Sequence, residues 1–90
     1  MSIKKLLNSP SLLILNFLYH MEAVRHKDLA RLITSRGTLS LTLNSLLEEG
    51  LISRHVNTET TPIQTYYAIT EKGKKVTEKL EEIKILLEEA

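Results

Sequence analysis

The sequence predicts a mainly α fold with a small β-hairpin, an α+β architecture. Four segments place their apolar residues at helical spacing, and one pair of short segments is rich in β-branched and aromatic residues. Leu, Ile, Val and Phe make up 29 of the 90 residues, a share well above that of disordered chains. This length predicts one domain over residues 1–90. Because so small a chain buries only about 60 to 65% of its unfolded surface, pairing with a second copy would bury more.

The first predicted helix covers about residues 10–21. Ser9 is a favourable N-cap, and Pro10 fits the first helical position, where its missing N–H costs no hydrogen bond. The segment is apolar on nearly all sides, as expected of a helix that several neighbours cover. We therefore expect this helix at the centre of the core.

The N-terminal region also has features of a signal peptide, because Lys4 and Lys5 precede an apolar stretch. We reject that interpretation, since Asn8, Pro10 and Asn16 interrupt the stretch and no cleavage site of small residues follows. No segment approaches the roughly 18 apolar residues of a membrane span. Cysteine is absent, which fits a reducing compartment. We expect a cytoplasmic protein with no membrane partner.

A helix-turn-helix is predicted in the next part of the chain. Residues 23–25 favour a short strand, and a helix of about two turns follows, ending near Thr34. Ser35 then caps a third helix over residues 35–49, which Gly50 ends. The third helix has a clear apolar side, formed by Leu39, Leu43, Leu46 and Leu47.

The C-terminal part predicts a β-hairpin and a long helix. The two strands cover residues 51–57 and 65–69, and alternation directs Tyr67 and Ile69 towards the core. Thr70 caps a final helix over residues 70–90, roughly 30 Å long. Its apolar seam has coiled-coil spacing and consists of Val76, Leu80, Ile83 and Leu87. Because no other segment remains to cover this seam, we expect a homodimer.

Two motifs extend the match beyond the order of the elements. The first is Ser35-x-x-Thr38-Leu39-Ser40-x-x-Leu43-x-x-Leu46-x-Glu48-x-Gly50-Leu51-Ile52, which is similar to the recognition-helix signature of HxlR-like and MarR-like transcription regulators. The second is Pro62 followed by Tyr67-Ala68-Ile69-Thr70-Glu71-Lys72-Gly73, which resembles the wing and final helix of the HxlR group. The resemblance covers roughly residues 10–88. It implies a winged helix-turn-helix and a homodimeric regulator that binds specific double-stranded DNA, with helix 35–49 in the major groove, wing 51–69 on the backbone and helix 70–90 pairing the subunits.

The charge distribution fits an anionic partner. Residues 1–47 carry six Lys/Arg and two Asp/Glu, whereas residues 48–90 carry six and nine. We expect Lys4, Lys5 and Arg31 to add to a positive surface, and Arg36 to be the best candidate for recognition of a guanine edge. The full predicted DNA-binding set is Arg25, Lys27, Ser35, Arg36, Gly37, Thr38, Ser40, Leu41, Asn44, Ser45, Arg54, His55 and Gln64.

Two positions depart from the pattern of these families. Related regulators commonly have a basic residue where this chain has Leu41. A leucine there either contacts thymine methyls or marks a surface that binds protein instead, and its small polar neighbours favour the first. The wing tip carries Glu59 and no Lys or Arg, which argues against deep insertion into the minor groove.

Other functional classes have less support. With one Asp, no Cys and no glycine-rich phosphate loop, the sequence offers no catalytic constellation, so we expect no enzyme. His20 and His26 flank Glu22, but their spacing matches no zinc pattern, and we expect no metal, no cofactor and no obvious small-molecule ligand. Two alternatives stay open. One is a winged-helix module that binds protein through Leu41, Tyr66 and the wing, and the other is a chromatin-like protein that binds DNA without specificity.

Overall fold

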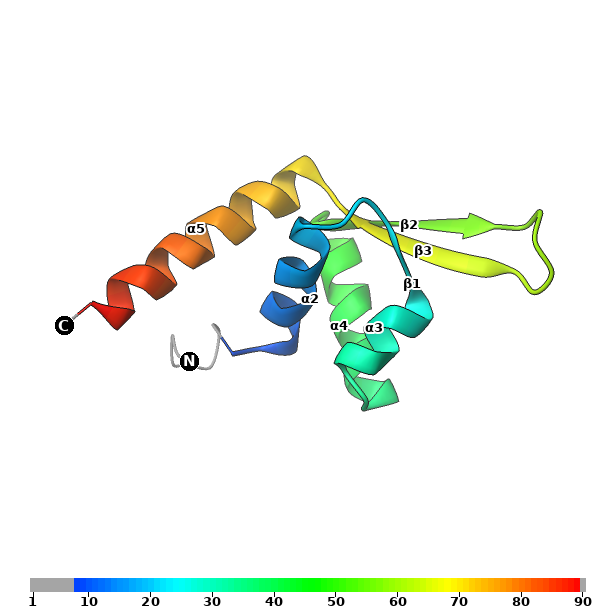
Figure 1. Ribbon diagram of the computed structural model, residues 1–90, viewed down its shortest axis with the longest axis horizontal. Helices are drawn as coiled ribbons and strands as arrows, with labels where there is room; N and C mark the ends of the chain where they lie inside the picture. The colour runs from blue at the N-terminus through cyan, green and yellow to red at the C-terminus, as the bar shows by residue number, and fades with distance from the viewer. Residues whose placement is uncertain (1–7, 90) are drawn as a thin grey trace.

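A computed structural model describes residues 8–89, which form four helices and a three-stranded antiparallel sheet (Figure 1). The elements are α2 (Pro10–Tyr19), β1 (Val24–Arg25), α3 (His26–Leu32), α4 (Arg36–Glu48), β2 (Ile52–Asn57), β3 (Gln64–Ile69) and α5 (Glu71–Glu88). The α+β architecture is confirmed, and each element lies within about two residues of its predicted bounds. Within the described part of the chain, no helix combines the length and hydrophobicity that crossing a membrane requires.

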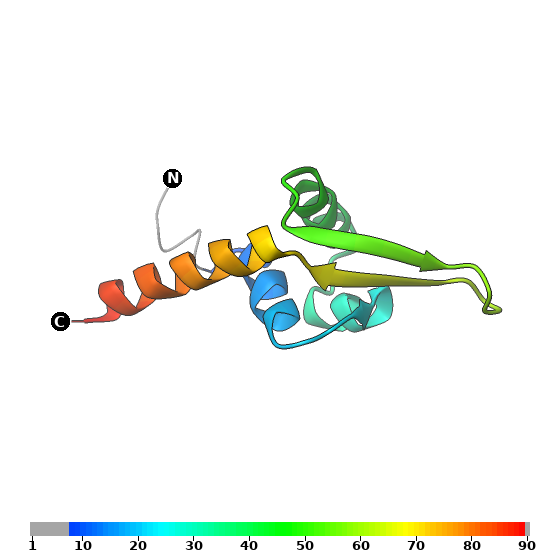
Figure 2. The same cartoon turned by 90° about the horizontal axis from the view of Figure 1, so that it is seen from above.

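The molecule is elongated because two elements project from a compact centre. Its extents are 52 × 26 × 20 Å. The wing, formed by β2 and β3, and helix α5 extend in opposite directions from the three shorter helices (Figures 1 and 2). The helix-turn-helix of α3 and α4 therefore lies between the wing and α5.

Helix α2 supplies the centre of the core, as its sequence predicts. Ile14 and Leu18 are fully buried, and so is Leu29 of α3. The remaining buried side chains of the cluster come from α2, β1, the end of α3, α4 and the sheet, and they are Leu15, Val24, Ile33, Leu39, Leu43, Leu46, Ile52 and Tyr67. Truncating any of these large apolar residues to Ala would cost about 2 to 5 kcal/mol of stability.

Three helices begin at the hydroxyl residues that the sequence predicts as caps. Ser9 Oγ accepts a hydrogen bond from the backbone N–H of Leu12 at 3.3 Å, and Ser35 Oγ accepts one from Thr38 at 3.3 Å. At the start of α5, Thr70 Oγ1 accepts a hydrogen bond from the backbone N–H of Gly73. Helix α4 ends at Glu48, and Gly50, which follows its C-cap Glu49, has a φ of 72° in the left-handed region that glycine adopts without strain.

The sheet has the order β1-β3-β2, so the short strand β1 joins the hairpin as a third strand. Tyr67 pairs with Val24 on one side and with Arg54 on the other. Tyr67 is buried, which confirms the predicted alternation of β3. The next row places Arg25, Tyr66 and His55 side by side on the opposite face of the sheet.

The first turn of α5 is bonded firmly to the segment that follows α4. Thr70 Oγ1 donates to the Gly50 carbonyl at 2.7 Å while accepting from the Gly73 N–H at 3.0 Å. Lys72 Nζ donates to the Glu49 carbonyl at 2.8 Å. Gly73 is buried, and a Cβ at this position would overlap the Leu51 carbonyl oxygen. The Thr-x-x-Gly part of the motif therefore holds α5 against the end of α4.

Candidate nucleic-acid interface

Helix α4 presents one apolar side to the core and one polar side to solvent. Leu39, Leu43 and Leu46 are at most 3% exposed. The side away from these leucines is exposed throughout, and it consists of Arg36, Gly37, Thr38, Ser40, Leu41, Asn44, Ser45 and Glu48. The predicted apolar side of the helix therefore does face the core, and short polar side chains dominate the exposed face of α4.

The structure brings the start of α4 together with α3. A surface hollow between the two helices is lined by Lys27 of α3 and by Arg36 and Ser40 of α4. The side chain of His26 lies in the same hollow. Three residues of the predicted set thus meet at one place although nine positions separate Lys27 from Arg36 in the sequence.

A second hollow lies between the start of α3 and the beginning of β3, next to the loop that connects the two wing strands. Arg25 and Lys27 line it together with Gln64, the first residue of β3, and with Pro62. His26 lines this hollow as well, so it borders both surfaces. Sequence reasoning treated His26 only as a metal candidate. Its position between Arg25 and Lys27 was the signal that could have placed it in the interface.

The basic side chains of this surface are free of carboxylate partners. Within residues 8–89 the two ion pairs both lie on α5, between Lys74 and Glu71 and between Lys79 and Glu82. The nearby carboxylate of Asp28 instead accepts a hydrogen bond from the Arg25 backbone N–H at 3.2 Å, at the start of α3. Positive charge around α3 and the start of α4 is therefore available to an anionic partner.

Two contacts define the wing side of this surface. The Arg25 guanidinium lies 6.0 Å from the centroid of the Tyr66 ring, at the outer limit of a cation–π contact. The Tyr66 hydroxyl donates to Gln64 Oε1 at 2.6 Å, which leaves the amide N–H groups of Gln64 for another acceptor. Arg54 and His55 are exposed on edge strand β2 and line neither hollow. Lys4 and Lys5 lie outside the described residues.

The family of the chain follows from a match that spans nearly all of it. The HxlR-like helix-turn-helix family matches residues 8–90. The chain belongs to this family. Its members are DNA-binding transcription regulators, which confirms the predicted resemblance and the expectation that the protein is not an enzyme.

Solved structures of similar proteins have the same fold. The Salmonella typhimurium protein ytfH, for which a role as transcriptional regulator is proposed, is 26% identical, with a TM-score of 0.74 over 96% of this chain and 78% of its own. The reduced transcriptional regulator YodB of B. subtilis is 26% identical, with a TM-score of 0.71 over 83% and 74%. A transcriptional regulator homologue of Pyrococcus horikoshii OT3 is 20% identical, with a TM-score of 0.77 over 94% and 89%. No functionally curated protein matches the chain.

The apolar seam of α5 in this HxlR-like protein is only partly as predicted. Val76 and Leu80 are half-buried, because the beginning of α5 packs along α2 of the same subunit. Ile83 and Leu87 remain 40% and 51% exposed. The seam also omits two apolar side chains near the end of α5, which are the exposed Ile85 and Leu86. Leu86 lies beside Ile83 and Leu87 and widens the uncovered apolar stripe toward the C-terminal end of the helix, whereas Ile85 lies on the opposite side, which faces α2.

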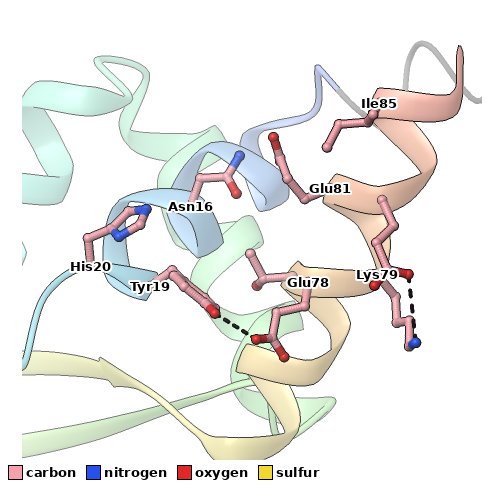
Figure 3. A pocket seen from close by; sticks show the side chains of 9 residues that line it. Asn16, Tyr19, His20, Glu78, Lys79, Glu81 and Ile85 are labelled. Atoms are coloured by element: carbon pink, nitrogen blue, oxygen red, sulfur yellow. Dashed lines mark hydrogen bonds and ion pairs between the residues drawn. The ribbon is translucent and has the colours of Figure 1, made fainter. Parts of the chain in front are cut away.

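A hollow of about 620 Å³ lies between α2 and α5 (Figure 3). The Tyr19 side chain of α2 points towards Glu78 of α5, and its hydroxyl donates to Glu78 Oε2 at 2.7 Å. This hydrogen bond raises the pKa of Tyr19 above its ordinary value, and partial burial and the negative charge of Glu78 act in the same direction. The contact fastens α5 to its own subunit, next to the segment whose apolar side chains are exposed.

Proposed function

We propose that this HxlR-like protein is a homodimer that binds a two-fold-symmetric, specific site in double-stranded DNA. Helix α4 occupies the major groove, the wing follows the DNA backbone, and α5 pairs the two subunits. The observation that carries this proposal is the exposed polar face of α4 beside a surface whose basic side chains have no carboxylate partner among residues 8–89.

The chemistry of the side chains assigns different DNA contacts to different parts of the proposed interface. Arg36 stands in the first turn of α4 and has the fork geometry that matches the O6 and N7 acceptors of guanine. Arg25 and Lys27 lie at the start of α3, where they neutralise phosphates and fix the orientation of the protein. The hydroxyl and amide side chains at the cap and on the outward face of α4 contact base edges or phosphates, and Gly37 lets the backbone approach the DNA closely. Leu41 faces the base edges, and Arg54, His55 and Gln64 contact the DNA backbone from the wing.

Pairing through α5 supports the symmetry of the site. Three large apolar side chains are exposed on one side of α5, namely Ile83, Leu86 and Leu87. Ile85 is also exposed, but it lies on the opposite side of the helix and lines the hollow between α2 and α5. Contiguous apolar surface of this kind is rare on monomers and is typical of an interface. Since α5 is bonded to the segment after α4, a fixed pairing of two α5 helices would also fix the separation of two α4 helices.

Selection of bound sequences from a random duplex library tests the proposal. The purified protein is used at about 150 mM salt, where non-specific attraction is screened. We expect an inverted repeat whose half-sites are about 34 Å apart, one helical turn of DNA. With about four to six phosphates neutralised per subunit, affinity should also fall steeply as salt is raised.

Two other results would each contradict specific binding. Salt-sensitive binding without a selected motif would indicate a non-specific, chromatin-like protein. No duplex binding at either low or physiological salt would favour the protein-docking module, in which Leu41 and Tyr66 face a protein.

A further inference from the structure

One residue on the outward face of α4 does not fit the polar character of its surroundings. Leu41 is 75% exposed, more than any other large apolar side chain among residues 8–89. It lies in the middle of the helix, with Arg36 in the first turn and Glu48 as the last residue. A leucine with so much of its surface in water contributes little to the core, so its presence here is not explained by the fold.

The neighbours of Leu41 argue against a protein-docking patch. The residues one helical turn away on the same side are Gly37, Thr38, Asn44 and Ser45, and all four are exposed, small or polar. Other strongly exposed apolar side chains lie on other elements, chiefly on α5 and the wing. Docking patches on proteins are contiguous areas of several hundred Å². A single leucine in a polar face is too small to form one.

The major groove does offer a partner of matching size. The thymine C5-methyl group is the apolar group that base edges present there, whereas the other groups at those edges are hydrogen-bond donors or acceptors. Asn44 stands three residues after Leu41, so the two side chains project from the same face about 5 to 6 Å apart. Asparagine pairs with N6 and N7 of adenine. Leu41 and Asn44 are therefore complementary to a thymine and a nearby adenine.

The charges of α4 restrict where guanine can be recognised. Arg36 is the single cation of the helix and stands in its first turn. The middle of the outward face has hydroxyl, amide and apolar groups only. A guanine contact by arginine is thus confined to one end, and the central part of the helix is left with the chemistry that suits A·T pairs.

We propose that Leu41 and Asn44 together specify A·T pairs at the centre of each half-site. Leu41 packs on a thymine C5-methyl group, and Asn44 forms hydrogen bonds with N6 and N7 of a nearby adenine. This proposal rests on the proposed function, because it requires α4 to lie in the major groove. It explains why a leucine occupies a position where a basic residue would add affinity for any sequence.

Replacement of thymine by deoxyuridine in the selected site tests the methyl contact, because it removes the C5-methyl group and leaves base pairing intact. Binding of the 90-residue protein is measured by competition for duplexes in which each thymine is replaced in turn. We expect one thymine in each half-site to be sensitive. Replacing it in one half-site should lower the affinity about fourfold, and replacing it in both half-sites should lower the affinity about fifteenfold. In the Leu41→Ala variant, the thymine and deoxyuridine duplexes should bind equally at that position.

Two further variants complete the design. Val56→Ala truncates another exposed apolar side chain, on the wing, and should retain the full response to deoxyuridine. Asn44→Ala should lose its response to 7-deazaadenine, which lacks the N7 acceptor, at an adenine near the sensitive thymine. Both Leu41 and Asn44 are exposed, so these variants should fold as the natural protein does.

The possible failures are distinguishable. A selected site at which no thymine responds to deoxyuridine, or at which the response persists in Leu41→Ala, overturns the proposed role of Leu41 and leaves specific DNA binding intact. A random library that yields no motif overturns the proposed function, and the A·T recognition falls with it.

Discussion

Helices α4 and α5 both expose apolar side chains, but they do so in different ways. On α4 a single leucine, Leu41, stands among small polar residues. On α5 the exposed side chains of Ile83, Leu86 and Leu87 lie next to one another on one side of the helix. A lone apolar side chain matches one methyl group of a base, whereas a contiguous patch needs another protein surface. The distribution of exposed apolar residues, rather than their number, therefore distinguishes the helix that we propose contacts DNA from the helix that we propose pairs the subunits.

The largest expected effect comes from placing a charge in the α5 patch. Ile83→Asp should convert the dimer to a monomer, because pairing would bury an unpaired carboxylate. Losing one of two linked half-site contacts should lower affinity for the inverted repeat by about 100-fold or more. Light scattering gives the oligomeric state, and titration with the selected duplex gives the affinity.

Ile63→Asp is the matched control for this charge substitution. Ile63 is 62% exposed at the wing, so its replacement places the same charge outside α5 and should leave the dimer intact. Because Ile63 lines the hollow that contains Arg25 and Lys27, this variant is the control for the oligomeric state and not for the DNA affinity. An Ile83→Asp protein that remains dimeric would show that α5 does not pair the subunits. The contrast between α4 and α5 would then need another explanation.

The next largest effect concerns the junction between the first turn of α5 and the segment after α4, where Gly73 packs against Leu51. Gly73→Ala adds a methyl group where the Leu51 carbonyl oxygen already lies, and the oxygen belongs to backbone that cannot easily move. We expect a loss of about 2 to 3 kcal/mol in the free energy of unfolding, measured by urea denaturation. Gly37→Ala is the control, because open space surrounds Gly37 in α4 and alanine favours a helix. Equal stability of the two variants would mean that the junction is not tightly packed.

Arg36→Ala tests the proposed contact between α4 and DNA. If Arg36 recognises a base, the variant should lose about 1 to 3 kcal/mol on the selected site and accept other bases at one position. Lys27→Ala provides the comparison, since loss of a phosphate contact should weaken binding to all duplexes alike and reduce the salt slope by about one. A uniform loss for Arg36→Ala would reassign that residue to the phosphates. Competition binding with matched and mismatched duplexes distinguishes these cases.

Local signals explain why most of the fold was predictable. Caps at Ser9, Ser35 and Thr70 and the stop at Gly50 are encoded by single residues, and the structure has each of them where the sequence indicates. The exposed face of α4 follows from helical periodicity alone. Such features depend on neighbours within one turn, so the sequence is sufficient to locate them.

Features that depend on distant contacts were less predictable. The half-burial of Val76 and Leu80 results from α5 packing along α2, and a heptad pattern carries no information about which partner covers it. The place of His26 in both hollows similarly requires α4 and the wing to converge on the start of α3. The individual DNA contacts remain predictions because they depend on a partner molecule.

The smallest expected effect concerns the hydrogen bond between Tyr19 and Glu78, which holds the first half of α5 against α2 and leaves the C-terminal half of α5 unaffected. Tyr19→Phe removes the hydrogen bond to Glu78 that fastens the first half of α5 to α2, and should lower the melting temperature slightly without changing the dimer. The pKa of Tyr19 is raised above its ordinary value of 10.0, so the folded state holds the phenol proton more tightly than the unfolded state. The stabilisation should therefore be complete below about pH 10 and disappear as the pH rises towards the pKa of the folded protein. Melting curves of both proteins from about pH 8 to about pH 11 test this, because their difference should shrink over the upper part of the range. A constant difference would indicate that Tyr19 acts through packing and not through its hydroxyl.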